Sequence, residues 1–338
     1  MMDFTSFKPV ALNAPTVSAK LELSDKLGAL KMRLGFGRDH YRLKPGLYRL
    51  GTPNGDSDVL ISANYKLSFD MLRKELEGLN LWILVVDTNG VNVWCAAGKG
   101  TFGTERVVKG IKEASLEHLV KHRRVILPQL CASGVAAHLV KEATGFKAVF
   151  GPALARDIKA FLDAGYKATP EMRKMGFPIK ERAKLIPNDF MYGKYWMLGI
   201  LAGFFFFAGL DKSGFLFEKM LATFAFPVLN IFCAYVAGIV FGPLFLTWIP
   251  FRAFALKGAF WGSLSTIGLT LLFTVSPLES IALGLVNVSV ASFMCMNFTG
   301  SSTYTSLSGV QKEMKWAVPF QIGFLALGVI LYIISKLV

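Results

Sequence analysis

Hydrophobic positions follow two different patterns along the chain. Up to about residue 165 they form short runs separated by amphipathic segments, whereas from about residue 194 they form long stretches with few charges. Five short runs have the length and β-branched content of buried strands: residues 46–50, 59–63, 81–87, 124–127 and 147–150. Four amphipathic segments predict helices: residues 69–77, 104–120, 135–143 and 153–164. This alternation predicts a parallel sheet with helices on both faces, a Rossmann-like α/β fold.

The long apolar stretches predict a second, all-α domain in a membrane. Each stretch approaches the ~20 residues that a helix needs to cross a bilayer, and there are five of them: residues 194–210, 220–245, 256–275, 278–298 and 317–335. We therefore expect a transmembrane domain of five helices. Three GxxxG patterns in it permit close helix packing: Gly199/Gly203, Gly238/Gly242 and Gly258/Gly262.

These patterns divide the chain into four predicted regions. Residues 1–42 form an N-terminal arm, whose first 32 residues are expected to be poorly ordered and to end in a short amphipathic helix. Residues 43–165 form the α/β domain and residues 194–338 the transmembrane domain. The basic segment between them, residues 166–193, contains three prolines and is expected to be a linker on the membrane surface.

Charge predicts the orientation of the chain in the membrane. There are 37 Lys and Arg residues against 23 Asp and Glu, a net charge of +14, and all but seven of the basic residues precede residue 195. The positive-inside rule then predicts a cytoplasmic N-terminal domain in the inner membrane and, after five crossings, an external C-terminus. We assign the positive charge to contact with anionic membrane lipid and not to nucleic acid, because no basic motif interleaved with aromatic residues is present.

The four cysteines lie far apart, and none belongs to a C-x-x-C pair. Structural zinc sites and iron–sulfur clusters draw on such clustered thiols. We therefore expect no iron–sulfur cluster in this chain, and a reducing compartment. The cysteines are Cys95, Cys131, Cys233 and Cys295.

The segment after the third predicted strand is the strongest candidate for chemistry. Asn92 is a good helix N-cap and Gly98 offers a C-terminal stop, so a short helix is predicted between them. Its first turn contains Val93, Trp94 and Cys95. The positive end of the helix dipole and Lys99, four residues after the cysteine, both favour the thiolate form of that cysteine.

Two alanines, Ala96 and Ala97, follow the cysteine and leave little side-chain bulk beside the sulfur. A flat and bulky partner could then approach the helix, so the segment suggests a soft anionic metal ligand on a bare platform. The alternative is that Cys95, like most single cysteines, is a small buried apolar residue. These residues alone leave both interpretations open.

Other ligand-binding motifs fit this region less well. Gly98–Gly103 matches G-x-G-x-x-G, but it starts about ten residues after its strand, where the dinucleotide fingerprint needs a tight first turn. A P-loop would need glycine where Val93 stands and Ser or Thr at Gly100. The D-x-H-x-x-G pattern that supplies a histidine to cobalt in many cobalamin proteins is also missing.

The run Asn92–Lys99, NVWCAAGK, resembles the cap-helix motif of the corrinoid protein of microbial mercury methylation, a relative of the corrinoid iron–sulfur protein of the acetyl-CoA pathway. The resemblance extends to the order of a soluble corrinoid domain and a membrane domain. It also covers four further segments: residues 33–38, 44–48, 63–70 and 100–105. In that family the cysteine of the motif is the lower axial ligand of cobalt, and the resemblance implies this role for Cys95.

The resemblance also implies that polar and small groups at the strand ends contact the edge amides of a corrin ring. The alternative is that these residues simply make turns. The groups expected on this rim are Thr52 and Asn54, Ser62 and Asn64, Asp87 and Thr88, Gln129 and Ser133, and Gly151 and Pro152.

The function implied is corrinoid-dependent methyl transfer from methyl-Co(III) cobalamin, or a related corrinoid, to inorganic Hg(II), which gives methylmercury. Two partners follow from the same resemblance. One is a ferredoxin-like protein with two [4Fe–4S] clusters that reduces the cobalt, and the other is a methyltetrahydrofolate-dependent methyl donor. The alternative is a membrane carrier or sensor with a nucleotide- or corrinoid-binding cytoplasmic domain, which the apolar stretches and the glycine-rich turn also fit.

Overall fold

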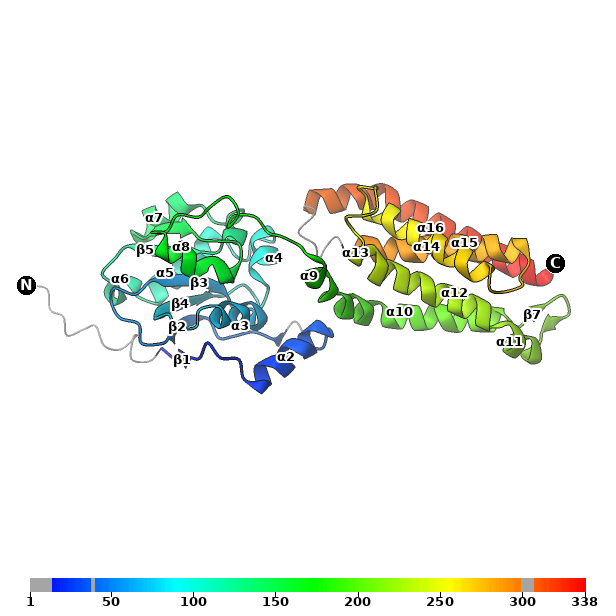
Figure 1. Ribbon diagram of the computed structural model, residues 1–338, viewed down its shortest axis with the longest axis horizontal. Coiled ribbons are helices and arrows are strands. Elements are labelled where there is room, and N and C mark those ends of the chain that lie inside the picture. The colour runs from blue at the N-terminus through cyan, green and yellow to red at the C-terminus, as the bar shows by residue number, and fades with distance from the viewer. Residues whose placement is uncertain (1–13, 38–39, 299–306) are drawn as a thin grey trace, which may run out of the picture. The chain divides into compact units, whose positions relative to one another are not determined.

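The computed structural model describes residues 14–37, 40–298 and 307–338. These residues form two compact units, one made of residues 14–32 and 36–176 and the other of residues 33–35 and 177–338. The first unit is built on a β-sheet and the second on long helices (Figure 1).

The first unit contains a six-stranded sheet in the order β1-β2-β4-β3-β5-β6. The strands are β1 (Thr16–Val17), β2 (Gly46–Leu50), β3 (Val59–Ala63), β4 (Leu81–Val86), β5 (Arg124–Leu127) and β6 (Lys147–Phe150). All five predicted strands are confirmed, and β3 to β6 are parallel. The sheet is mixed, however, because β2 runs antiparallel to β4. Only residues 51–58 join β2 to β3, and a parallel arrangement would need a crossover of about a dozen residues.

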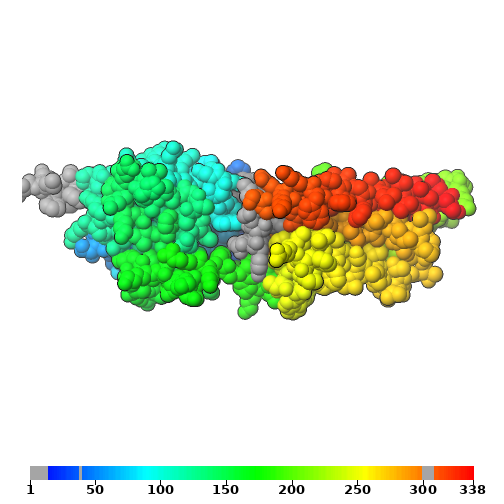
Figure 2. All heavy atoms as spheres, turned by 90° about the horizontal axis from the view of Figure 1, so that it is seen from above, coloured from blue at the N-terminus to red at the C-terminus, as the bar shows by residue number. Residues whose placement is uncertain are grey.

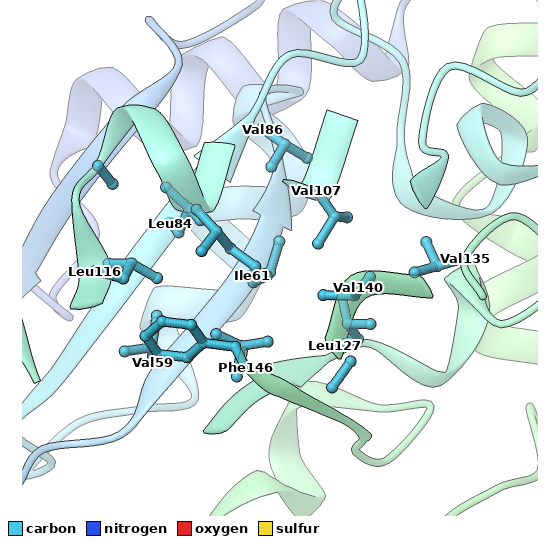
Figure 3. Close-up of a cluster of buried hydrophobic side chains, with 14 of the residues drawn as sticks. Val59, Ile61, Leu84, Val86, Val107, Leu116, Leu127, Val135, Val140 and Phe146 are labelled. Atoms are coloured by element: carbon cyan, nitrogen blue, oxygen red, sulfur yellow. The ribbon is translucent and has the colours of Figure 1, made fainter. Parts of the chain in front are cut away.

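The helices of this unit are α2 (Leu23–Arg33), α3 (Lys66–Lys74), α4 (Val93–Gly98), α5 (Thr104–Glu113), α6 (Leu116–Leu119), η3 (Gln129–Cys131), α7 (Ala137–Thr144), η4 (Ala155–Asp157) and α8 (Ile158–Asp163). They cover both faces of the sheet, as predicted. Successive strand residues point to opposite faces. Ile83 therefore packs with α3 and α8, while Leu84 packs on the other face with α5 and α7 (Figure 3). The predicted helix over residues 104–120 is broken at Ser115, whose φ of 47° is left-handed.

Residues 1–13 lie outside the described residues. From residue 14 onward, the segment that precedes β2 has more regular structure than the sequence predicted. β1 extends the sheet beside β2, and α2 is tied to α3 by a cluster of four charged side chains. Asp25 accepts hydrogen bonds from Lys66 and Arg73, both at 2.6 Å. The same two cations bind Asp70, at 2.6 and 2.8 Å. The short helix predicted at the end of the arm is therefore confirmed as α2, whereas the expected lack of order does not hold for residues 14–22, which include β1.

This charge cluster makes the stability of the unit depend on pH. Burial raises the pKa of Asp25, but hydrogen bonds from Lys66, the Glu22 amide and Arg73 outweigh it and lower the pKa from 3.8 to about 2. Stability from this group is therefore full above pH 3.8 and is lost as the pH falls toward about 2. We expect Asp25→Asn to lower the free energy of unfolding by about 2 kcal/mol at pH 7. We also expect the unfolding temperature of this variant to fall less steeply as the pH is lowered.

Thermal unfolding followed by circular dichroism at several pH values measures this effect. Asp56→Asn is the matched control, because Asp56 also pairs with a lysine, Lys121 at 3.0 Å, but both side chains are well exposed. Equal effects of the two substitutions would contradict the role assigned to Asp25.

The second unit consists of α9 (Ile179–Ala183), α10 (Ile186–Phe207), α11 (Phe217–Thr223), α12 (Ala225–Val236), the π-helix η5 (Ala237–Phe241), α13 (Gly242–Leu244), α14 (Phe254–Thr270), α15 (Pro277–Asn297) and α16 (Leu307–Leu337), with a small hairpin of β7 (Leu210–Asp211) and β8 (Gly214–Phe215). Within this unit α16 lies along α15 (Figure 2). Among the described residues, four helical stretches are long and apolar enough to cross a membrane: Ile179–Phe207, Ala225–Leu244, Pro277–Asn297 and Ser308–Leu337.

The predicted count of five spanning helices is not confirmed. The third predicted stretch, residues 256–275, corresponds to α14, which has 17 residues and ends at Thr270. The chain turns soon afterwards because Ser276 caps α15 by accepting a hydrogen bond from the Glu279 amide at 3.2 Å.

Two of the three GxxxG patterns lie where helices meet closely. A Cβ added at Gly238 would lie 2.6 Å from the Ala291 carbonyl oxygen in α15, and one added at Gly258 would lie 2.2 Å from the same oxygen. A Cβ at Gly199 would meet no atom within 4 Å. The predicted role in close packing is therefore confirmed for Gly238/Gly242 and Gly258/Gly262, but Gly199/Gly203 faces open space.

Candidate functional site

The loop after β4 leads into α4 through a side-chain cap. Asn92 Oδ1 accepts a hydrogen bond from the Cys95 amide at 2.9 Å, which confirms the predicted N-cap. The Asn92 amide nitrogen Nδ2 in turn donates to Cys95 Sγ at 3.4 Å. One side chain therefore holds both the backbone and the sulfur of Cys95, and the thiol is only half-buried.

Asn64 at the end of β3 fixes the path of this loop. Its buried Oδ1 accepts from the Thr88 amide at 3.0 Å and from the Gly90 amide at 2.9 Å. The Thr88 hydroxyl lies 2.9 Å from the same oxygen and 2.7 Å from the Val91 carbonyl oxygen. The Asn64 Nδ2 donates to Asp87 Oδ1 at 3.0 Å. These predicted corrin-binding residues therefore also build the turn that presents α4.

Replacing Asn64 with alanine is expected to loosen this turn. Two buried backbone amides would lose their acceptor, and each unsatisfied buried group costs about 1–3 kcal/mol. We expect a loss of about 2–4 kcal/mol in thermal unfolding and weaker cobalamin binding in a spectroscopic titration. The control is Asn54→Ala, an exposed turn asparagine, which should change neither quantity appreciably. Unchanged binding by an Asn64→Ala protein that is measurably destabilised would contradict the link between the turn and the site.

The alanines of α4 face the opposite way from the prediction. Ala96 and Ala97 are 0% and 6% exposed and belong to the core under the sheet edge. A Cβ added at Gly134 would lie 3.2 Å from the Ala97 Cα, so the loop after η3 packs directly on this side of α4. The alanines therefore do not form the predicted open surface beside the Cys95 sulfur. Their small side chains instead allow α4 to pack close to the core.

The open surface of α4 is formed by its last turn. Gly98, Lys99 and Gly100 are exposed, and a Cβ added at either glycine would meet no atom within 4 Å. Trp94, like Cys95, is half-buried, and Val93 packs against the core. A flat ligand over Cys95 would thus meet this glycine-rich end.

The carboxyl ends of β3 to β6 lie at one edge of the sheet, and several predicted rim residues gather there. Neighbouring β3 and β5 continue in opposite directions, to β4 and β6, which is the switch point where open α/β sheets bind ligands. At or beyond these strand ends lie Asn64, Asp87, Thr88, Gln129, Ser133, Gly151 and Pro152. Gln129 Oε1 accepts a hydrogen bond from Arg173 at 3.1 Å, and Gly151 is buried.

Three predicted rim residues are placed elsewhere. Thr52 and Asn54 lie at the opposite edge, because β2 is antiparallel and Leu50 pairs with Leu81 at the start of β4. The Thr52 amide accordingly donates to Asn80, just before that strand, at 2.8 Å. Ser62 lies inside β3 and is 3% exposed. The prediction treated every strand end as equivalent, which holds only for parallel strands.

The other thiol of this unit is unsuited to the same chemistry. Cys131 in η3 is 0% exposed, and burial raises its pKa to about 12. Within residues 14–37, 40–298 and 307–338, no group of three or more His, Cys, Asp and Glu side chains could hold a metal ion. A single accessible thiol suits a metal whose remaining ligands come from a bound organic group, and soft thiolates are strong donors to such metals.

A cavity of about 600 Å³ lies between the paired strands β2 and β4 and the helix α5. Its walls include Leu47, Val86 and Asp87, with Arg106 and Lys109 on α5. Arg106 pairs with Asp87 at 3.4 Å, a contact not expected from the sequence because the two residues lie on separate elements. Cys95 is not among the residues that line this cavity.

The family match lies within the first unit. Residues 36–162 match the family model described as CO dehydrogenase/acetyl-CoA synthase delta subunit. Similar proteins include acetyl-CoA decarbonylase/synthase complex subunit gamma of Methanopyrus kandleri, 32% identical over 128 residues, which are 37% of this chain and 27% of the relative. The corrinoid/iron-sulfur protein large subunit of Moorella thermoacetica is 30% identical over 125 residues, 36% of this chain and 28% of that protein.

The first unit is related to the corrinoid proteins of the acetyl-CoA pathway. The chain spans little more than a quarter of the length of these curated relatives. The gamma subunit of Archaeoglobus fulgidus matches to the same extent, 30% identical over 131 residues, 38% of this chain and 27% of the relative. The family match ends at residue 162, before the helices of the second unit begin.

Proposed function

We propose that the first unit binds a corrinoid with Cys95 as the lower axial ligand of cobalt, and that the protein transfers a methyl group to inorganic Hg(II), which gives methylmercury. The observation that carries this proposal is the half-buried Cys95 thiol, held by Asn92 at the edge of the sheet that receives ligands. The relation to corrinoid proteins supports the cofactor, and the NVWCAAGK motif supports the acceptor.

The residues present fit such a cofactor by their chemistry. Cys95 Sγ would supply the protein's ligand to cobalt, while the exposed Gly98 and Gly100 leave the adjoining surface free of bulk. Polar groups for the ring's edge amides would come from Asn92 and Lys99 at the two ends of α4 and from the accessible rim residues Asp87, Gln129 and Ser133. The buried Asn64 and Thr88 would instead hold the rim in shape. When bound, the corrinoid supplies a cobalt–carbon bond from which the methyl group can leave with either sign of charge.

The chain's own residues would decide which sign is favoured. A thiolate donates electron density strongly, so as a ligand Cys95 would favour chemistry in which the methyl group keeps the bonding electron pair and goes to an electrophile such as Hg(II). The Asn92 Nδ2–H···Sγ contact fixes the direction of the sulfur, and the cap keeps α4 in place. Val93 and the buried alanines anchor that short helix in the core.

Turnover would require partners, because the reaction consumes methyl groups and electrons. We propose a ferredoxin-like protein with two [4Fe–4S] clusters as the reductant and a methyltetrahydrofolate-dependent system as the methyl donor. The exposed last turn of α4 leaves room for them to approach the site.

We further propose that α14 also spans the membrane, which gives five crossings with the first unit in the cytoplasm and the C-terminus outside. Support comes from the glycines of α14, Gly258 and Gly262, which pack directly on the spanning helix α15. The excess of basic residues before residue 195 supports the orientation.

A second candidate function is methyl transfer to a nucleophilic acceptor, as a carrier in acetyl-CoA chemistry. The relatives named for the acetyl-CoA decarbonylase/synthase complex favour it. In that case the methyl group leaves without the electron pair, and a strong thiolate donor below the cobalt offers no advantage. Assays of purified, reduced and methylated protein with Hg(II) or with a thiol acceptor separate the two candidates.

A visible and EPR spectrum of the full-length protein with cobalamin tests the proposed ligand. We expect tight binding and a spectrum typical of sulfur coordination, which Cys95→Ala converts to that of a corrinoid without a protein ligand. Cys131→Ala, in the same unit but with a buried thiol, should leave the spectrum unchanged. A Cys95→Ala spectrum identical to that of the parent protein would reject axial ligation.

A further inference from the structure

The helix α2 presents its apolar residues outward. Leu23, Leu27 and Leu30 are 71%, 56% and 54% exposed. Their spacing of four and then three residues places them in one stripe along the helix. Single exposed leucines are common on protein surfaces, but a continuous stripe on one helix indicates an interaction surface.

The opposite side of α2 is fixed to the first unit by polar contacts. Asp25 is bound by Lys66 and Arg73, and Arg73 also donates to the Ser18 and Lys20 carbonyl oxygens. Gly28 packs so closely on Tyr41 that an added Cβ would lie 2.3 Å from the phenol oxygen. Rotating α2 to bury its leucines would break these contacts, so the leucine stripe is held toward the outside.

Cationic side chains border the leucine stripe on both sides. Lys26 and Lys31 are exposed, and at ~100° per residue they lie roughly 70° to either side of the stripe. Within α2 the acidic side chain is Asp25, which is turned inward. Leucines flanked by lysines are typical of helices that lie in a membrane interface, with the leucines in the acyl region and the ammonium groups beside lipid phosphates.

We propose that α2 is an in-plane membrane anchor that lays the first unit on a bilayer containing anionic lipid. The chain itself keeps a bilayer within reach, since the second unit contains helices that can span one. The positive charges of the two lysines complement anionic headgroups. A protein partner would explain the leucines, but it would give no reason for exposed cations on both borders of the stripe.

Photo-crosslinking in the full-length protein tests this anchor. A photoreactive amino acid is placed at Leu27, or at Leu139 as the control, and the protein is reconstituted in nanodiscs of phosphatidylcholine with phosphatidylglycerol. Leu139 on α7 is also well exposed, at 44%. We expect lipid adducts, identified by mass, at position 27 and at least about fivefold fewer at position 139. Adducts of position 27 with protein, or equal lipid yields at the two positions, would overturn the proposal.

A charge-reversal variant tests the part played by the lysines. Lys26→Glu with Lys31→Glu leaves the leucines and Asp25 unchanged, so α2 should still pack on the first unit. We expect the lipid adduct at position 27 to fall at least about fivefold in anionic nanodiscs, with a much smaller change in discs of phosphatidylcholine alone. An equal fall in both types of disc, or none in either, would overturn the proposed contact with anionic headgroups.

Discussion

Cys95→Ala is expected to reduce methylmercury formation at least about 100-fold, since loss of support for a metal ligand already costs up to that factor. In the proposed function the Cys95 sulfur is the ligand atom, and alanine offers none. Cys95→His should lose much less activity, because imidazole can also bind cobalt from below. The measurement is methylmercury formed from added Hg(II) by membranes of cells that express the full chain together with its partners.

Two outcomes decide how this result is interpreted. If the alanine and histidine variants lose all activity equally although both remain folded, axial ligation by residue 95 is excluded. Cys131→Ala is the internal control, and its activity should stay within a few-fold of the parent protein because the Cys131 thiol is 0% exposed and has no part in the proposed ligation.

The second large effect is expected in the helical unit. Gly258→Leu should prevent α14 from packing on α15, because even a Cβ at this position would lie 2.2 Å from the Ala291 carbonyl oxygen and 2.6 Å from the Cys295 Cβ. The nearest obstacle is backbone, which cannot move aside as a flexible side chain could. We expect destabilisation of more than about 3 kcal/mol, at the upper end of the cost of overpacking.

The yield of monodisperse detergent-solubilised protein and its thermal aggregation temperature measure this effect. Gly199→Leu is the matched control, since it also lies in a GxxxG pattern of an apolar helix but has open space around it. Near-normal behaviour of Gly258→Leu would show that α14 and α15 can separate without loss of structure.

The parts of the fold that were predicted correctly depend on local signals. β-branched runs bounded by turns marked five of the six strands of the sheet, β2 to β6, and Asn92 followed by a short apolar segment marked the cap of α4. The orientation of β2 was missed, although the short link to β3 could have indicated it. Periodicity reports which residues are buried and says nothing of the direction in which neighbouring strands run.

What could not be predicted depends on residues far apart in the chain. Asn64 was expected on the rim as a possible ligand group, but its role in shaping the loop before α4 became visible only through its bonds to Thr88 and Gly90. The side of α4 that faces the core was likewise undetermined, since a helix this short shows no clear apolar period. The motif was enough to single out Cys95 as a candidate, but which side of α4 is buried could be learned only from the fold.

The charge cluster of Asp25, Lys66, Asp70 and Arg73 bears on how the first unit can be cut out for study. A fragment that starts at residue 43 would keep Arg73 and Lys66 but remove Asp25, together with the Ser18 and Lys20 carbonyl oxygens that Arg73 binds. Two cations would then share one buried carboxylate, and the sheet would lose β1 from its edge. Recombinant versions intended for crystallography or spectroscopy are better begun at or before Ala14.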